Sequence, residues 1–230
     1  MTAAGIPVLA IDGPSGSGKG TISRRVAQRL GWELLDSGAL YRLVAVGAMR
    51  AGLRPDDIPA HAALASAMRV RFAVRDGGGE QVLLDGEDVT AEVRGEAAGN
   101  GASRVAAWGP VRSALLQRQR DFARPPGLVA DGRDMGTVVF PDARLKIFLT
   151  ASAEERALRR YNQLKDKGSG VSLAALSREI AERDERDTRR ALAPLKAADD
   201  AIVVDSTSLD IDEVVERVMR LAHERGLATR

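Results

Sequence analysis

The sequence predicts an α/β fold in which a parallel sheet of about five strands is flanked by helices and carries a small antiparallel insert. The first observation is an apolar run at 7–12 that leads through a glycine-rich loop into an amphipathic helix over 19–30. The second is a later alternation of apolar runs with helical patterns, which favours parallel strands joined by helices. These later runs are 128–131, 145–149 and 201–205. The third is an interruption near 68–94, where strand patterns follow one another.

The remaining elements follow from helical periodicity and from residues that begin or end a helix. A further short strand is expected at 32–35, and helices are expected over 19–30, 37–50, 110–122, 152–167 and 172–190 and from 210 onwards. Ser152 to Glu155 has the pattern of a capping box, in which the two side chains cap each other's backbone N–H. Gly168 to Gly170 separates two of the helices.

The segment near 68–94 has the pattern of an antiparallel hairpin. Val70, Phe72 and Val74 alternate with polar or small residues, three glycines follow at 77–79, and 81–84 is a second apolar run. The dipeptide Asp85-Gly86 is typical of another tight turn. We interpret this segment as an insert on the substrate side of the chain.

Composition excludes several classes of protein. The chain of 230 residues is 44% apolar but only 3% aromatic, so we expect a globular core of aliphatic side chains. It has no cysteine, which excludes disulfides and thiolate zinc sites and agrees with a cytoplasmic location. A net charge of +2 gives little support to nucleic-acid binding, and no apolar run is long enough to predict a membrane span.

The loop from Gly13 to Thr21 carries the strongest functional signal. Glycines let the backbone wrap around an anion, backbone N–H groups at a helix N-terminus point at phosphate oxygens, and the lysine adds a positive charge. We therefore predict an ATP site formed by Gly13, Pro14, Ser15, Gly16, Ser17, Gly18, Lys19, Gly20 and Thr21. Gly20 separates Lys19 from Thr21, a variant seen in kinases of nucleoside monophosphates. The alternative is a glycine-rich turn that binds no ligand.

Six segments resemble the bacterial cytidylate (CMP/dCMP) kinase family in order and spacing. They are IDGPSGSGKGT at 11–21, LLDSGALYR at 34–42, LDGEDVTAEVR at 84–94, DGRDMGTVVFPDA at 131–143, RDERDTRR at 183–190 and DSTSLDIDEVV at 205–215. The resemblance covers essentially the whole chain. It implies transfer of the γ-phosphoryl group of Mg-ATP to CMP or dCMP. It also implies a three-layer phosphate-loop kinase core (1–36, 105–155 and 191–230), a monophosphate-binding insert (37–104) and a short helical lid (156–190).

The same resemblance implies the residues that hold the acceptor. They are Ser37, Tyr41, Arg42, Ser103, Arg112, Arg133, Asp134, Arg183, Asp187 and Arg190. The assignment is chemically sensible for the base, because Asp134 can accept from the cytosine amino group while Arg112 and Ser103 donate to O2 and N3. Local alternatives stay open. Ser37 is also a good N-cap, Asp134 could cap a turn, and Arg112 could lie on a solvated helix face.

One carboxylate and several cations are expected around the phosphates. Asp131 ends a buried strand. Phosphate-loop enzymes hold Mg²⁺ from this position, directly or through water. The alternative is that the Asp131 carboxylate is hydrogen-bonded to local backbone. The resemblance implies that the catalytic cations are Lys19, Arg133, Arg183 and Arg190, and that a cationic lid over the triphosphate draws on Arg156, Arg159 and Arg160. Arg183, Asp187 and Arg190 are spaced i, i+4, i+7, so they share one helix face. The alternative to a catalytic role is therefore an exposed face on which these charges form salt bridges.

Two rival functions remain open on the sequence alone. One is a kinase of another monophosphate, UMP or AMP, from which the set Ser103, Arg112 and Asp134 would distinguish a cytidylate kinase. The other is a non-catalytic phosphate-loop switch that holds a nucleotide as a signal. We expect ATP and Mg²⁺ to be required, CMP or dCMP as the small-molecule partner, no nucleic-acid or membrane partner, and a monomer.

Overall fold

The computed structural model describes residues 5–74, 80–165 and 171–228, and the chain divides into two compact units. Unit 1 comprises Met1–Asp36 and Arg120–Arg230, and unit 2 comprises Ser37–Gln119. The glycines at 77–79, the break at 168–170 and the expected helix end at 167 lie outside the described residues. Within the described ranges we find no helix with the length and hydropathy needed to cross a bilayer.

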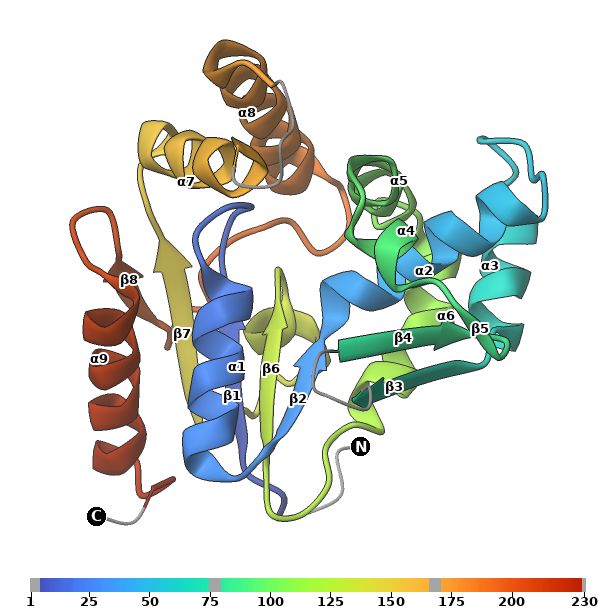
Figure 1. Cartoon of the computed structure of the whole chain (residues 1–230). Coiled ribbons are helices and arrows are strands. Elements are labelled where there is room, and N and C mark those ends of the chain that lie inside the picture. Colours follow the sequence, from blue (N-terminus) through green and yellow to red (C-terminus); the bar gives the residue numbers. More distant parts are fainter. Residues whose placement is uncertain (1–4, 75–79, 166–170, 229–230) are drawn as a thin grey trace. The chain divides into compact units, whose positions relative to one another are not determined.

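Unit 1 is built on a five-stranded parallel sheet, which confirms the predicted fold class (Figure 1). Its strands, in spatial order, are β2 (Glu33–Asp36), β6 (Leu128–Gly132), β1 (Val8–Asp12), β7 (Leu145–Thr150) and β8 (Ile202–Asp205). The central strand β1 is buried throughout. The register pairs Asp12 with Gly132 and Asp36 with Asp131, so three strands end together at one edge of the sheet.

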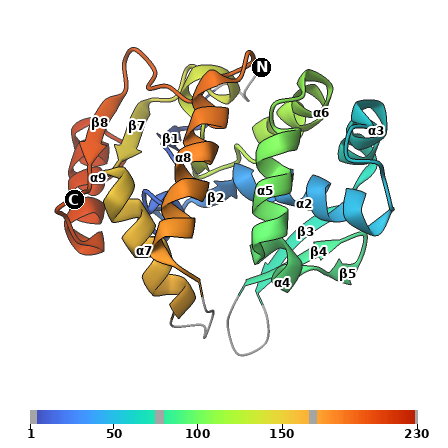
Figure 2. The ribbon, with the colours of Figure 1, turned by 90° about the horizontal axis from the view of Figure 1, so that it is seen from above.

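Helices cover this sheet and extend beyond its carboxyl edge. They are α1 (Lys19–Leu30), α7 (Ala153–Lys165), α8 (Leu173–Arg189) and α9 (Ile211–Glu224), with a short π-helix η1 (Met135–Val139) after β6. Ile22 and Val26 of α1 share one aliphatic core with Val214 and Val218 of α9. Helices α7 and α8 pack against each other beyond the carboxyl ends of the strands (Figures 1 and 2). The ends of the central strands are therefore flanked by helices that carry many arginines.

Unit 2 combines a three-stranded antiparallel sheet with helices, as expected for the insert. Its strands are β3 (Val70–Val74), β4 (Glu80–Leu84) and β5 (Glu87–Asp88), and its helices are α2 (Ser37–Arg50), α3 (Ile58–Ala67), α4 (Thr90–Arg94), α5 (Glu96–Val105) and α6 (Gly109–Arg120). The predicted turn at Asp85-Gly86 joins β4 to β5 with positive φ values of 51° and 95°. Helix α5 packs closely on α2, because a Cβ added to Gly101 would lie 2.6 Å from the Cβ of Ala45.

Two features of the fold differ from the expectations. Helices α3, α4 and α5 and the π-helix η1 were not predicted. The inserted unit also extends to Gln119, whereas the sequence suggested an insert at 37–104. The physical reason is that α6 contacts its own unit, since Arg118 Nη2 donates to Met68 O at 2.9 Å.

Candidate active site

The loop after β1 encloses the ammonium group of Lys19. Gly18, directly before α1, has a φ of 90°, a left-handed conformation that favours glycine. Gly13 lies so close to β7 that an added Cβ would stand 2.0 Å from Leu149 O. Lys19 is buried, and its Nζ donates to Pro14 O at 2.7 Å and to Ser17 Oγ at 3.4 Å. The loop therefore has the strand, tight glycine turn and helix that a phosphate site requires.

Buried carboxylates surround this lysine and shift its proton equilibrium. Burial lowers the pKa of Lys19 to about 7 and Arg133 adds to the effect, whereas Asp131 and Asp12 oppose it. Burial also raises the pKa of Asp131 to about 7, while Lys19 opposes this shift and Asp36 adds to it. The cluster can therefore exchange protons near neutral pH, as functional sites often do.

Asp131 is the carboxylate beside the loop that could hold a magnesium ion. Gly20 leaves space beside the carboxylate, because a Cβ at that position would lie 3.5 Å from Asp131 Oδ2. Thr21 is exposed in the first turn of α1. Over the described residues, no group of three or more His, Cys, Asp and Glu side chains could hold a metal by itself. Mg²⁺ usually takes one or two protein carboxylates and completes its shell with water and phosphate, and Asp131 could supply one of those carboxylates.

The turn after β6 and the end of α8 bring four predicted acceptor residues together within unit 1. Arg133 Nε donates to Asp187 Oδ2 at 3.0 Å, and its Nη1 donates to Gly132 O at 3.2 Å. Arg190 Nη2 lies 3.9 Å from Asp134 Oδ1, and Arg190 Nε donates to Ala193 O. These contacts contradict the exposed, salt-bridged helix face. The Arg190 side chain is only 5% exposed and follows the last residue of α8, and Asp187 pairs with Arg133.

Arg183 and Arg156 connect α8 to the phosphate loop. Arg183 contributes to the lowered pKa of Lys19, so its charge reaches the loop. Arg156 is buried, and its guanidinium donates to Ser15 O at 3.0 Å, to Ala151 O at 3.0 Å and to Asp184 Oδ2 at 2.6 Å. One side chain therefore joins the loop, the start of α7 and α8.

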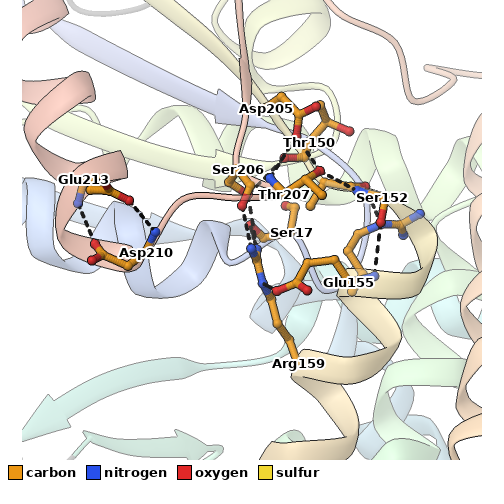
Figure 3. Close-up of polar contacts among 12 residues, drawn as sticks. Ser17, Thr150, Ser152, Glu155, Arg159, Asp205, Ser206, Thr207, Asp210 and Glu213 are labelled. Atoms are coloured by element: carbon orange, nitrogen blue, oxygen red, sulfur yellow. Dashed lines mark hydrogen bonds and ion pairs between the residues drawn. The ribbon is translucent and has the colours of Figure 1, made fainter.

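Arg159 joins the same loop to the segment after β8. Its Nη1 and Nη2 donate to Ser206 Oγ at 3.1 Å and Ser206 O at 2.6 Å, while Nε donates to Glu155 Oε1 at 2.8 Å (Figure 3). Nη1 also lies 3.5 Å from Ser17 O. Arg160, the third predicted lid cation, is partly buried one residue further along α7.

The capping box at the start of α7 is only half formed. Ser152 Oγ accepts from Glu155 N at 3.2 Å, as predicted. The Glu155 carboxylate, however, pairs with Arg159, and Ser152 N donates to Thr207 Oγ1 at 3.0 Å (Figure 3). Ser152 N and the Glu155 carboxylate would form the second half of the box, but each binds another residue instead. A complete box instead begins α9, where Asp210 and Glu213 cap each other (Figure 3).

In unit 2, helix α2 positions three of the predicted acceptor residues. Ser37 and Tyr41 are both buried, as expected for two residues four apart on one helix face. Arg42 is half-buried, and its Nη1 donates to Val93 O at 2.9 Å and to Gly95 O at 3.1 Å. Arg42 therefore also stabilises the junction of α4 and α5.

Helices α5 and α6 carry the other two predicted acceptor residues of unit 2. The guanidinium carbon of Arg112 lies 6.0 Å from the centroid of the Tyr41 ring, at the outer limit of a cation–π contact. Its Nη1 also reaches Ala106 O at 3.4 Å. Ser103 is buried, and its Oγ has no hydrogen-bond partner in the described part of the chain. The hydroxyl can therefore be satisfied by a polar ligand or by an ordered water.

Three residues with polar roles in the site were missed by sequence reasoning: Asp12, Asp184 and Ser206. Burial raises the pKa of Asp12 to about 6, although hydrogen bonds from Gly136 and Met135 oppose the shift. Its position at the end of a strand is the signal that singled out Asp131 and could have found Asp12 too. Asp184 and Ser206 have no such signal, because their arginine partners come from another helix.

A lysine buried inside the loop that opens α1, at the edge of a parallel sheet, is the arrangement of phosphate-loop nucleotide-binding proteins. Within that class, the family model for cytidylate kinase matches residues 9–224. A cytidylate kinase from Stutzerimonas stutzeri (strain A1501) is 60% identical over 224 residues, which cover 97% of this chain and 98% of that protein. One from Pseudomonas aeruginosa (strain LESB58) is 60% identical over 222 residues, covering 96% and 97%. This chain belongs to the cytidylate kinase family.

Similarity to solved structures is much weaker. A shikimate kinase from Acinetobacter baumannii in complex with shikimate matches with a TM-score of 0.47 and 15% identity, covering 97% of both chains. A match at that level assigns no substrate to this chain.

Proposed function

We propose that this chain transfers the γ-phosphoryl group of Mg-ATP to CMP or dCMP, giving ADP and CDP or dCDP. The observation that carries the proposal is the cluster of buried Lys19 and Asp131 with half-buried Arg133, in a chain of the cytidylate kinase family. The rival functions are not favoured, because proteins named cytidylate kinase match almost the whole chain at 60% identity.

The donor is assigned to the phosphate loop. Backbone N–H groups of the loop and the N-terminus of α1 bind the phosphate oxygens, and Lys19 places its charge on the β- and γ-phosphates. Asp131 and Thr21 are the residues that would hold Mg²⁺, and the bound ion would offset the charge of the phosphates. Arg156 and Arg159 contact the carbonyl oxygens of the loop, so we assign to them the shaping of the loop around the triphosphate.

Acceptor residues are assigned in each unit separately. From unit 1, Arg133 and Arg183 bind the acceptor's phosphate, Asp187 contacts the ribose, and Asp134 accepts from the cytosine amino group. Two N–H groups of Arg133 are already used to hold its side chain on Asp187 and Gly132, which fixes its direction. Unit 2 contributes Ser37, Tyr41, Arg42, Ser103 and Arg112. The buried Ser103 hydroxyl is the donor that a cytosine ring acceptor would satisfy.

No general base is required. The acceptor phosphate oxygen attacks the γ-phosphorus in line, and catalysis comes from positioning two anions and compensating their charge. We assign Arg190 to the transferring group together with Arg183, and Arg160 to the outer side of the triphosphate. Water competes as an acceptor, so closure of α7 and α8 over the loop should protect ATP from hydrolysis.

Measuring ADP release with and without CMP tests this function. We expect rapid release only when CMP is present, and Lys19→Ala should reduce it by several orders of magnitude because the developing charge loses its cation. Arg178→Ala is a matched control, since Arg178 is an exposed cation on α8 outside these contacts. More than about a tenth of the activity in Lys19→Ala, or release without CMP, would contradict the mechanism.

A further inference from the structure

Asp12 is the last residue of β1, directly before the phosphate loop, and its carboxylate binds two amides of the segment that follows β6. The residue is 5% exposed. Its Oδ1 accepts from Met135 N and its Oδ2 from Gly136 N, both at 2.8 Å. These two N–H groups belong to the first residues of η1, where a carboxylate is favoured by the unpaired amides of a helix N-terminus.

The same strand therefore holds both ends of a very short turn. On one side, the register of β1 and β6 pairs Ile11 with Asp131 and Asp12 with Gly132. On the other side, the Asp12 carboxylate holds the amides of Met135 and Gly136. Only two residues, 133 and 134, lie between these anchor points, and they are the arginine and the aspartate assigned to the acceptor.

The backbone between the two anchor points is irregular. Asp134 has φ −149° and ψ 25°, which is neither helical nor strand-like. Space around the anchor is also tight, because a Cβ added to Gly136 would lie 3.4 Å from Asp12 Oδ2 and 3.1 Å from Lys146 Cδ. An asparagine at position 12 could accept only one of the two N–H groups and would point its own NH₂ at the other. Both oxygens of an aspartate are thus required.

We propose that Asp12 is a positioning residue for acceptor recognition, because its carboxylate holds Arg133 and Asp134 in the conformation that reads the nucleotide. The proposal rests on the proposed function. A role confined to stability would lower the melting temperature and leave the choice of acceptor unchanged. A positioning role changes that choice, because Asp134 is the residue assigned to the base.

The test is the ratio of kcat/KM for CMP to that for UMP at saturating Mg-ATP, in wild type and in Asp12→Asn. Both acceptors use the same phosphate loop, so any effect on ATP cancels from the ratio. We expect the ratio to fall by about tenfold or more, since a displacement of about 1 Å can cost a positioned group about 10²-fold. Val26→Ala is the control. Val26 is a fully buried residue of α1, and its truncation should lower the melting temperature without moving the ratio.

A second variant and a double mutant keep the test decisive. Gly136→Ala crowds the anchor from the other side and should lower the same ratio, even if Asp12→Asn fails to fold. In an Asp134→Ala background, Asp12→Asn should have almost no further effect on the ratio, because both act on one contact. A ratio within about twofold of wild type in both single variants would overturn the proposal. If the wild type itself shows no CMP-dependent turnover, the proposed function has failed instead.

Discussion

Binding of Mg-ATP should move protons at two residues of the loop in opposite directions. In the free chain, burial and Arg133 lower the pKa of Lys19 to about 7. Contact with a triphosphate favours the ammonium form, so the lysine takes up a proton. Burial raises the pKa of Asp131 to about 7, and holding Mg²⁺ requires the carboxylate form, so the aspartate releases one.

The expected size and sign follow from these two values. A group with a pKa of about 7 is about 10% deprotonated at pH 6 and about 90% at pH 8. At pH 8, uptake by Lys19 therefore outweighs release by Asp131, and we expect a net uptake that approaches one proton. At pH 6 the two contributions exchange and give a net release of similar size.

Isothermal titration calorimetry in buffers of different ionisation enthalpy measures this proton count. Lys19→Arg should abolish the uptake at pH 8, because a guanidinium stays charged throughout this range. Asp131→Asn should abolish the release at pH 6. A net change below about 0.2 proton at both pH values, or an uptake that survives in Lys19→Arg, would refute the reasoning about this cluster.

Three further predictions concern acceptor recognition, rate and stability. Asp134→Ala should raise KM for CMP far more than KM for ATP, because a hydrogen bond to a charged group contributes about 1.5–3 kcal/mol; equal effects on both would indicate a purely structural turn. Arg190→Ala should lower kcat by on the order of 10³-fold, whereas the exposed control Arg178→Ala should not; similar small effects in both would remove Arg190 from the mechanism. The pKa of Asp131 is higher in the folded state than the ordinary 3.8, so its contribution to stability is full below that pH and is lost as the pH rises to about 7. The free energy of unfolding in urea should therefore decline less between these pH values for Asp131→Asn than for wild type. Equal declines would contradict the raised pKa of Asp131.

The parts of the fold that the sequence predicted are those with a local cause. Helix α1 shows its apolar face in Ile22 and Val26 and ends at Gly31, whose φ is 64°. Helix α5 was missed because glycines lower helix propensity, and Gly99 and Gly101 lie in its middle. Gly101 is required there by the closeness of Ala45, a tertiary contact that no local pattern reveals.

The candidate site divides in the same way. The residues of the phosphate loop and of the Arg133–Asp134 turn could be found because each set is contiguous in the chain. The hydrogen bonds from Met135 and Gly136 to Asp12 could not be found, since they join residues more than 120 positions apart. Arg156 was predicted only as a lid cation. Its contacts with Ser15 and Asp184 depend on how α7 and α8 fold onto the loop.

A competition in one reaction, followed by anion-exchange chromatography of the nucleotides and a phosphate assay, tests the assigned activity most directly. The wild-type chain, Mg-ATP and equal amounts of CMP and UMP are mixed, and the diphosphates are identified as they form. We expect CDP and ADP to appear together in equal amounts and well before UDP, and dCMP to replace CMP. Equal formation of CDP and UDP, or ADP accompanied only by inorganic phosphate, would contradict it.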